Sequence, residues 1–483
     1  EEEEEEEEEE AAQADGDAEV DEFDLKPRRL EQCFGGENPL LLSISIDSFL
    51  ERYSADGAAA VLELATSLMN ASGLPDASLT IADADVDDEE EVLEALITNK
   101  TCERLVDEAQ ERMIFVEPYP LADKKTGKRH LKDLTALWRQ LIDKTQHEVL
   151  FDGVLFPWVI EWMCAMSQSP HRGVRHTGTE AGMALMVRMT ELAVELATQA
   201  TAKQRQASKP GKKGGAGMAA ILKEEVERLQ ENETALEEMV TAAFTGLFVE
   251  RYRDSAEEVR ASCLSALGRV MQLHPSMFLA DTYLKYLGWL LSDMAAAVRA
   301  ASLSQLSAVY TAHGAAEEIC RVDGKPVSGA ERLLNFTRRF ESRFIEMTRD
   351  VDVKVAVKAI KLVDLLHDLD LLADKAQAVS EVVRVMRNNE PSQLKALVPL
   401  VDKQMEAGAA GPPSSGKRKG KKGGAASQPI VQLASYAWDM AGGEAEKMPE
   451  EAEQGEEAEV AEKMPEEAEQ GEEAEVAEKM PEE

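Results

Sequence analysis

Apolar residues recur along this chain at helical spacing, and the strict alternation typical of strands is nearly absent. Between residues 48 and 73 the pattern predicts two helices that separate at Asp56-Gly57, with Gly73 ending the second. Further helices are predicted at residues 88–113, 130–148, 152–167, 175–206 and 218–252, with a Gly/Lys-rich interruption at 208–217. Shorter helices continue to Gln404. The periodicity therefore predicts an all-α chain.

Three segments share one arrangement of apolar positions, which indicates an internal repeat. The members of each ladder are Val259-Arg260 with Leu264, Leu267 and Val270; Val298-Arg299 with Leu303, Leu306 and Val309; and Val355 with Ile360, Val363 and Leu366. The second ladder lies 39 residues after the first and the third 57 residues later, because "GAAEEICRVDGKPVSGA" (314–330) is inserted before it. Such a ladder is typical of the second helix of a HEAT-type pair, which buries its apolar stripe only against neighbouring pairs. We predict a HEAT-repeat-like α-solenoid.

The stretch "DTYLKYLGWLLSD" (281–293) predicts a short helix with an unusual outer face. Leu284, Leu287 and Leu291 fall on one side of this helix, flanked by Tyr283 and Leu290. Lys285, Tyr286 and Trp289 project towards the other side, where a free-standing amphipathic helix would be polar. Two explanations stay open: the rings pack between repeats, because solenoid helices are covered on two sides, or they form a surface for a partner.

The charge of the chain is concentrated at its ends. The formal net charge is −40, yet residues 1–24 hold sixteen acidic and no basic residues, and residues 441–483 hold eighteen acidic residues and three lysines. The middle, 25–440, has 59 acidic against 50 basic residues. The central part is therefore free to carry local basic patches despite the overall charge.

Both ends have low complexity and are expected to be disordered acidic tails. The chain opens on ten glutamates, and the end repeats "EKMPEEAEQGEEAEVA" with a period of sixteen residues. Before these repeats, a Gly/Pro/Ser linker carries the basic cluster Lys417, Arg418, Lys419, Lys421 and Lys422. This cluster fits a nuclear-import signal and equally a solubilising linker.

Several function classes lack the residues they need. Five scattered cysteines without a C-x-x-C spacing indicate neither a disulfide framework nor a zinc site, and suit a reducing compartment, cytosol or nucleus. No apolar run is long enough for a membrane span and no secretory signal opens the chain, which begins at glutamate and is expected to be a fragment. We predict no membrane partner.

Three weak motifs are set aside. Asp83, Asp85, Asp87 and Glu94 match positions of a calcium loop, but Asp88 stands where the loop needs glycine. His171 and His176 lack metal-ligand spacing, and "GKKGGAGM" (211–218) follows no strand and lacks the P-loop order. We therefore predict no catalytic residues, no metal and no cofactor.

Beyond these patterns, the residues resemble a known family. "FVERYRDSAEEVRASCLSALGRVMQLHPSMFLADTYLKYLGWLLSDMAAAVRAASLSQLSAVY" (248–310) resembles the stromalin domain of the STAG subunits of cohesin, and the likeness resumes across residues 333–366. Upstream, "VRHTGTEAGMALM" (174–186) is similar to the preceding STAG domain. The resemblance covers roughly residues 45–400; "FVERYRD" and "YLKYLGW" are its specific segments. Family members are much longer, so we expect their later HEAT repeats to be missing here.

The resemblance implies a domain order. It predicts an acidic tail at 1–37, a STAG-like helical domain at 38–247, a stromalin-like HEAT-repeat domain at 248–406, and a disordered linker with acidic repeats at 407–483. It also implies a non-catalytic nuclear, chromosomal scaffold. STAG subunits bind the kleisin subunit of cohesin and through it the SMC ring. They help the ring to engage DNA, support sister-chromatid cohesion and chromosome organisation, and accept aromatic peptide motifs of regulators.

The resemblance implies that the face with Lys285, Tyr286 and Trp289 belongs to a partner-binding surface. The positions carried over for kleisin and peptide motifs are Tyr252, Arg253, Lys285, Tyr286, Trp289 and Arg339. Aromatic side chains on a rigid helix lose little entropy on binding, and nearby cations pair with acidic residues that flank a partner's aromatic anchor.

Basic residues suggest contacts with double-stranded DNA without sequence preference, because nothing resembles a base-reading helix. Lys354, Lys358 and Lys361 share one helix face, with Arg343 on the preceding helix. A second group comprises Arg172, Arg175, Lys203, Arg205, Lys209, Lys212 and Lys213. Each charge run is also compatible with a solvated face.

Two functions of other classes stay as alternatives. An importin-like nuclear transport adaptor also uses HEAT pairs, but presents asparagine–tryptophan ladders or acidic inner faces, whereas here Trp289 accompanies Lys285 and Arg253. An enzyme on a helical scaffold would need a deep pocket with several ionisable residues away from Trp289.

Overall fold

The computed structural model describes residues 26–33, 39–75, 77–84, 88–208, 216–322, 325–385, 393, 395–401 and 403. The acidic runs at both ends of the chain lie outside these residues. So do the predicted DNA contacts Lys209, Lys212 and Lys213, and the basic cluster Lys417, Arg418, Lys419, Lys421 and Lys422.

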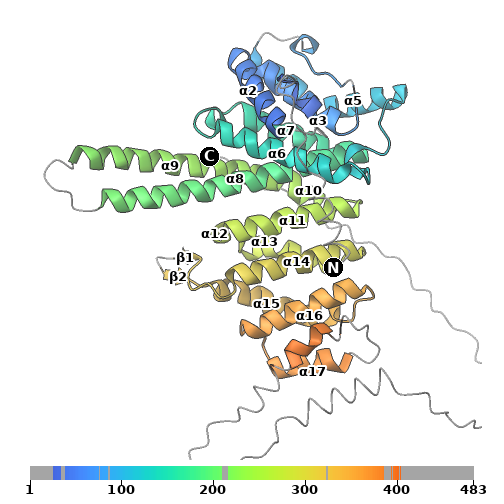
Figure 1. The fold of residues 1–483 in the computed structure, drawn as a ribbon, viewed down its shortest axis with the longest axis vertical. Coiled ribbons are helices and arrows are strands. Elements are labelled where there is room, and N and C mark those ends of the chain that lie inside the picture. The colour runs from blue at the N-terminus through green and yellow to red at the C-terminus, as the bar shows by residue number, and fades with distance from the viewer. Residues whose placement is uncertain are drawn as a thin grey trace, which may run out of the picture. The chain divides into compact units, whose positions relative to one another are not determined.

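The described residues are overwhelmingly helical, which confirms the all-α prediction (Figure 1). The first half contains η1 (Leu30–Cys33), α2 (Pro39–Ala55), α3 (Gly57–Ala71), η2 (Ile81–Asp83), α4 (Glu89–Leu96), α5 (Asn99–Arg112), η3 (Pro120–Ala122), α6 (Gly127–Thr145), η4 (Val149–Phe151), α7 (Leu155–Gln168), α8 (Arg172–Ala207) and α9 (Ala216–Ala243). The second half contains η5 (Phe244–Phe248), α10 (Val249–Arg251), α11 (Glu257–Leu273), α12 (Pro275–Phe278), α13 (Asp281–Leu290), α14 (Ala296–His313), β1 (Cys320–Val322), β2 (Lys325–Val327), α15 (Gly329–Met347), α16 (Val353–Asp368) and α17 (Lys375–Val385).

Local capping explains the predicted break between the first two long helices. Asp56 is the N-cap of α3, and its carboxylate accepts a hydrogen bond from the Ala59 N–H at 2.9 Å. Gly73 follows the end of α3 with φ 91°, a left-handed conformation that favours glycine. Both features were expected from the sequence.

Two expectations require correction. The single helix predicted at 88–113 is two helices, because Thr98 caps α5 by accepting from the Thr101 N–H at 3.1 Å. The insertion at 314–330 contains the short antiparallel hairpin β1–β2, and every other described element is a helix. The tail predicted at 1–37 includes η1, whose Leu30 is fully buried against α2 and α3; apolar burial therefore begins before residue 38.

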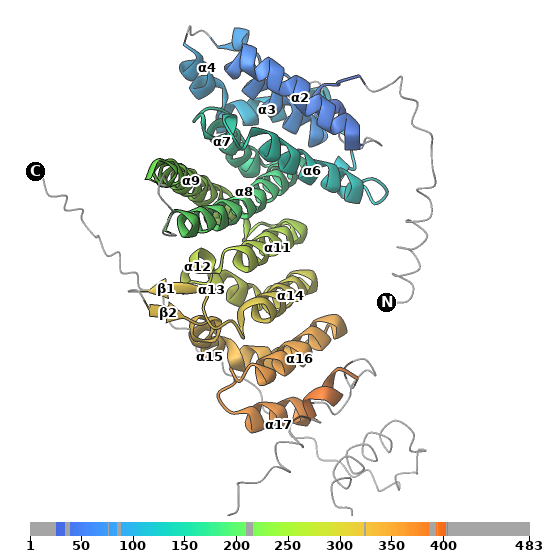
Figure 2. The ribbon, with the colours of Figure 1, turned by 60° about the vertical axis from the view of Figure 1, so that its left-hand side comes forward.

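Helical pairs stack in two layers across the second half of the described chain. The second helices of the pairs, α11, α14 and α16, contact one another in that order, and they are the three segments whose apolar ladders repeat (Figure 2). Helices α13 and α15 form the other layer and contact each other and their pair partners. Upstream, α8 and α9 lie side by side as a long hairpin, and α8 also packs on α11 (Figure 1). The architecture is an α-solenoid, as predicted.

An arginine–aspartate ladder connects successive pairs. Arg260 on α11 donates two hydrogen bonds to Asp293, at 2.8 and 2.7 Å, and Arg299 on α14 donates two to Asp350, at 2.7 and 2.6 Å. Arg175 on α8 begins the series through Asp254 at 2.8 Å. Each aspartate also accepts from the backbone N–H two residues later, which fixes the turn between the helices of its pair. The third apolar ladder lacks the arginine, because Ala356 follows Val355.

The arginine–aspartate ladder predicts that the protein loses stability in acid. Burial alone would raise the pKa of Asp254 and Asp350, but backbone N–H donors and their arginines outweigh it and hold both pKa values below the ordinary 3.8. The unfolded chain therefore takes up these protons first on acidification, so the contribution to stability is complete above about pH 4 and is lost as pH falls through the folded-state pKa values. We expect the urea midpoint to drop steeply below about pH 4.

The Asp350→Asn variant checks this assignment. Its midpoint should already be lower than wild type at pH 7 and should fall less steeply between pH 5 and 3. An acid limb parallel to that of wild type would mean that other carboxylates cause the loss.

Candidate functional site: an aromatic ridge flanked by cations

The predicted partner-binding residues start at the end of a long helix that contains one π turn. The π turn η5 separates α9 from α10 and holds one residue more than an α turn would. Phe244 and Phe248 within it stack at 4.7 Å between ring centroids, and Phe248 stacks on Tyr252 at 6.0 Å. The result is a column of rings that ends at Tyr252, at the C-terminus of α10.

Helix α13 brings two more rings to this column. Tyr286 lies 4.8 Å from Tyr252 and 5.5 Å from Trp289, and Tyr252 lies 6.3 Å from Trp289, all between ring centroids. Tyr252 is half-buried, whereas Trp289 is 45% exposed. We call Tyr252, Tyr286 and Trp289, with the cations beside them, the aromatic ridge.

Cations lie over these rings. The Arg253 guanidinium is 5.3 Å from the centre of the Tyr252 ring, and the Lys285 ammonium is 5.0 Å from that of Tyr286 and 5.4 Å from that of Trp289. These distances lie within the range of cation–π attraction. Within the described part of the chain, neither Arg253 nor Lys285 forms an ion pair. Their charges are therefore available to carboxylates of a partner.

Arg339 lies on a helix that packs closely on α13 at a glycine. Its guanidinium lies 5.5 Å from the ring centre of Phe340, and Phe340 packs directly on Gly288 of α13. A Cβ added at Gly288 would lie 2.3 Å from the Phe340 ring, so only glycine permits this close approach. The packing places Arg339, which is exposed, on the helix next to α13. Neither Gly288 nor Phe340 was singled out from the sequence.

The burial of Tyr286 differs from the prediction made from the sequence. The sequence pattern placed Tyr286 with Trp289 on the outer face of α13, yet Tyr286 is only 7% exposed. Phe244, Phe248 and Tyr252 enclose its ring, because the π turn η5 and the C-terminal end of α10 cover that side of α13. Burial raises the pKa of Tyr286, although Arg253 opposes the shift. Tyr286 is therefore a neutral support for the exposed Trp289 rather than a free contact.

The first group of predicted DNA residues is largely engaged within the protein. Arg175 is a correction: its side chain is 12% exposed and holds Asp254 in the ladder, so it is unavailable to a phosphate. Arg172 pairs with Glu258, and Lys203 on α8 pairs with Glu225 on α9. Arg205 is exposed near the end of α8.

The second group is more accessible. Lys354 and Lys361 are exposed on α16 and form no ion pair within the described residues, whereas the Lys358 ammonium donates to the Ser304 hydroxyl at 2.7 Å. Arg343 is partly committed, since it donates to the Leu291 carbonyl at 3.0 Å and pairs with Glu346 at 3.3 Å. Exposure and the lack of a partner among the described residues are what a lysine needs to contact a phosphate backbone.

Sequence reasoning missed the aspartates of the arginine–aspartate ladder, although a repeated spacing in the sequence marks them. Asp254 precedes Arg260 by six residues, and Asp293 precedes Arg299 by the same interval. This repeated Asp-to-Arg spacing marks the turn and the second helix of each pair.

Among the described residues, no group of His, Cys, Asp and Glu side chains is arranged to hold a metal ion. None of the described helices is both long and apolar enough to cross a bilayer.

Family models match two consecutive regions of the chain. The STAG domain matches residues 117–232, and the stromalin conservative domain matches residues 253–321. The second match includes Arg253 and all three ridge residues of α13, and Tyr252 immediately precedes it.

Curated relatives and a solved structure extend the similarity. Sister-chromatid cohesion protein 3 of Arabidopsis thaliana is 35% identical over 356 residues, which cover 71% of this chain and 30% of that protein. Cohesin subunit SA-3 of Rattus norvegicus is 31% identical over 326 residues, covering 66% and 24%. This chain thus spans less than a third of either relative. The fold resembles cohesin subunit Scc3 from Z. rouxii with a TM-score of 0.67 and 17% identity, covering 88% of this chain and 48% of that one.

Proposed function

We propose that this chain, which belongs to the family of STAG- and stromalin-domain proteins, is a non-catalytic scaffold subunit of cohesin in the nucleus, on chromosomes. In this role it binds the kleisin subunit, and through it the SMC ring, and supports sister-chromatid cohesion and chromosome organisation. The aromatic ridge binds the kleisin, and it also docks aromatic peptide motifs of regulators.

The aromatic ridge is the observation that carries the partner-binding proposal. Trp289 is large, rigid and 45% exposed, and its position is set by the buried Tyr286 and by Tyr252. Arg253 and Lys285 stand beside it without carboxylate partners in the described residues. This combination suits a segment that inserts an aromatic side chain and flanks it with acidic residues.

A pull-down of kleisin fragments tests the proposal. Wild-type chain should retain a fragment that the double variant Tyr252→Ala/Trp289→Ala loses. The double variant Met294→Ala/Val351→Ala is a matched control, because it removes two almost fully exposed apolar side chains elsewhere on the described surface. Equal retention by all three proteins would rule out the ridge as the kleisin site.

DNA binding is proposed for the face of α16. Lys354 and Lys361 are exposed and unpaired within the described residues, and such lysines bind phosphates without reading bases. We expect the triple variant Lys354→Glu/Lys358→Glu/Lys361→Glu to bind duplex DNA more weakly than wild type. The slope of log affinity against log salt should decrease in size by up to about 3, near 0.9 per lost phosphate contact.

A charge-matched variant controls for the change in net charge. Lys124→Glu/Lys125→Glu/Lys128→Glu reverses three exposed lysines, two in the turn before α6 and one in its first turn, and should change the salt slope much less. If both triple variants lower the affinity equally, the α16 face is not a specific DNA contact.

A further inference from the structure

The ridge is one end of a longer seam between two parallel helices. Ring contacts pair the α9–α10 segment with α13 in the same direction, at 4.9, 5.0 and 6.3 Å between centroids, for Phe244 with Tyr283, Phe248 with Tyr286, and Tyr252 with Trp289. Each step of four residues in one segment matches a step of about three in the other. The two segments therefore run side by side, and the seam leads from Trp289 back towards α12 and the middle of α9.

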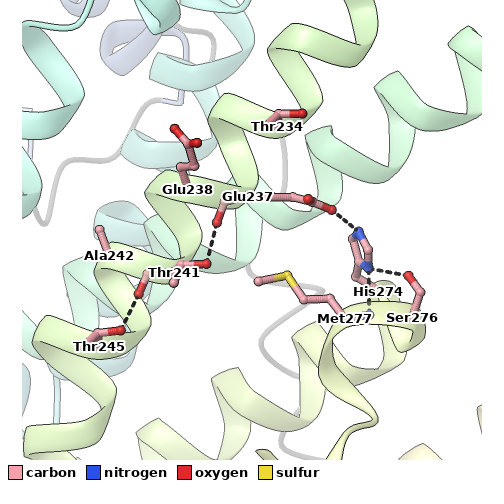
Figure 3. Close-up of a pocket in the computed structure, with 9 residues that line it drawn as sticks. All are labelled: Thr234, Glu237, Glu238, Thr241, Ala242, Thr245, His274, Ser276 and Met277. Carbon is pink, nitrogen blue, oxygen red and sulfur yellow. Dashed lines mark hydrogen bonds and ion pairs between the residues drawn. The ribbon is translucent and has the colours of Figure 1, made fainter.

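At the other end, the seam opens into a groove between α9 and α12 (Figure 3). The groove has a volume of about 750 Å³ and is lined by Thr234, Glu237, Glu238, Thr241, Ala242, Thr245, His274, Ser276 and Met277. The Thr241 and Thr245 hydroxyls donate to carbonyls of their own helix, at 2.7 and 2.8 Å, so these hydroxyls are already satisfied. With Ala242 and Met277, they make a largely apolar floor.

The groove carries two carboxylates, those of Glu237 and Glu238. The Met277 N–H donates to His274 Nδ1 at 3.4 Å, and His274 Nε2 donates to the Glu237 carboxylate at 3.0 Å. Glu238 is the next residue on the same helix and is exposed (Figure 3). Burial and the Glu237 carboxylate raise the pKa of nearby Glu233, although His274 opposes the shift. None of the nine residues that line the groove is a lysine or an arginine.

The seam is therefore bipolar, with cations at the ridge and carboxylates at the groove. Glu237 and Tyr252 are fifteen residues apart on a nearly continuous helix, a distance of about 22 Å at 1.5 Å per residue. An extended segment covers that distance in about seven residues at roughly 3.3 Å each. Charge complementarity thus defines both the composition and the spacing of a segment that lies along the seam.

We propose that a segment anchored on the aromatic ridge continues along the seam and places a basic side chain against Glu237 and Glu238. The occupant is an extended partner segment with acidic residues next to its aromatic anchor and lysine or arginine about seven residues away. This inference rests on the proposed docking function of the ridge. It adds a second recognition element, which selects among aromatic motifs by their distant basic residues.

Three fluorescent peptides test the inference. All contain the same aromatic anchor with flanking aspartates; one has two lysines centred seven residues before the anchor, one has them seven residues after it, and one has alanines in both places. At about 50 mM salt, one lysine peptide should bind the wild-type chain about fivefold more tightly than the alanine peptide, as expected for two rim ion pairs. The Glu237→Lys/Glu238→Lys variant should abolish this gain and leave the affinity of the alanine peptide within about twofold.

Control variants separate the possible outcomes. Glu91→Lys/Glu94→Lys makes the same change in charge on α4 and should preserve the gain. Glu237→Gln/Glu238→Gln removes the charge but keeps an acceptor for His274, so it should lose the gain without unfolding the groove. Unchanged melting of all variants by circular dichroism shows that the fold is retained.

Two results would overturn the inference. If the three peptides bind wild type equally, while Trp289→Ala weakens all of them, the ridge docks the anchor but the groove selects nothing. If Glu237→Lys/Glu238→Lys weakens the alanine peptide as much as the lysine peptides, the effect is not recognition of the basic residue. By contrast, unchanged binding of every peptide to Trp289→Ala would refute the proposed ridge function itself.

Discussion

Replacing Trp289 with alanine is expected to weaken the binding of an aromatic-motif peptide by about 2–4 kcal/mol, or roughly 30- to 700-fold in Kd. Trp289 supplies the largest exposed apolar area of the ridge, and its ring is oriented by Tyr286 and Tyr252 before a partner arrives. Removing the indole also deprives Lys285 of one of the two rings beneath it. Fluorescence anisotropy with a labelled peptide measures the change directly.

Folding should be affected far less than binding. Because Trp289 is 45% exposed, its removal should change the free energy of unfolding by less than about 1 kcal/mol. Lys285→Met keeps an apolar stem over the rings and removes the cation, so we expect a smaller loss of affinity, about 1 kcal/mol. A Trp289→Ala chain that binds the peptide as well as Met294→Ala does would exclude Trp289 as the anchor site.

The second large effect is expected from Asp293→Ala, which should lower the free energy of unfolding by about 3 kcal/mol. Asp293 is nearly buried and accepts three hydrogen bonds, two from Arg260 and one from the Ala295 N–H at 2.8 Å. Its loss leaves the Arg260 guanidinium, which is 13% exposed, without a countercharge and releases the turn that joins α13 to α14. Urea denaturation followed by circular dichroism provides the measurement.

An exposed pair provides the comparison. Glu346→Ala breaks the ion pair with Arg343, but Glu346 is 66% exposed, so the expected loss is at most about 0.5 kcal/mol. The double variant Arg260→Met/Asp293→Ala should lose less than the sum of the single changes, because no charge is then left unpaired. If Asp293→Ala and Glu346→Ala have equal effects, the ladder is not a main support of the stack.

The family resemblance identified the ridge residues, but the sequence could not predict their mutual arrangement. Tyr252 and Trp289 are 37 residues apart and meet only because α10 and α13 lie in neighbouring pairs. The pattern within α13 placed Tyr286 and Trp289 on the same outer face, since helical periodicity describes one helix and not what covers it. The helix α10 and the π turn before it decide that Tyr286 is enclosed and Trp289 is not.

By itself, the sequence determined the helical class, the boundary at Asp56-Gly57 and the repeating ladders of α11, α14 and α16. These features depend on local capping and on helical periodicity, and both are set by residues that are close together in the sequence. Only the tertiary structure decided which charges are free: it commits Arg175 to Asp254 and leaves Lys354 and Lys361 exposed. It also joined the ridge to an acidic groove. Burial and pairing depend on the neighbours that packing brings from distant parts of the chain, and no single segment contains that information.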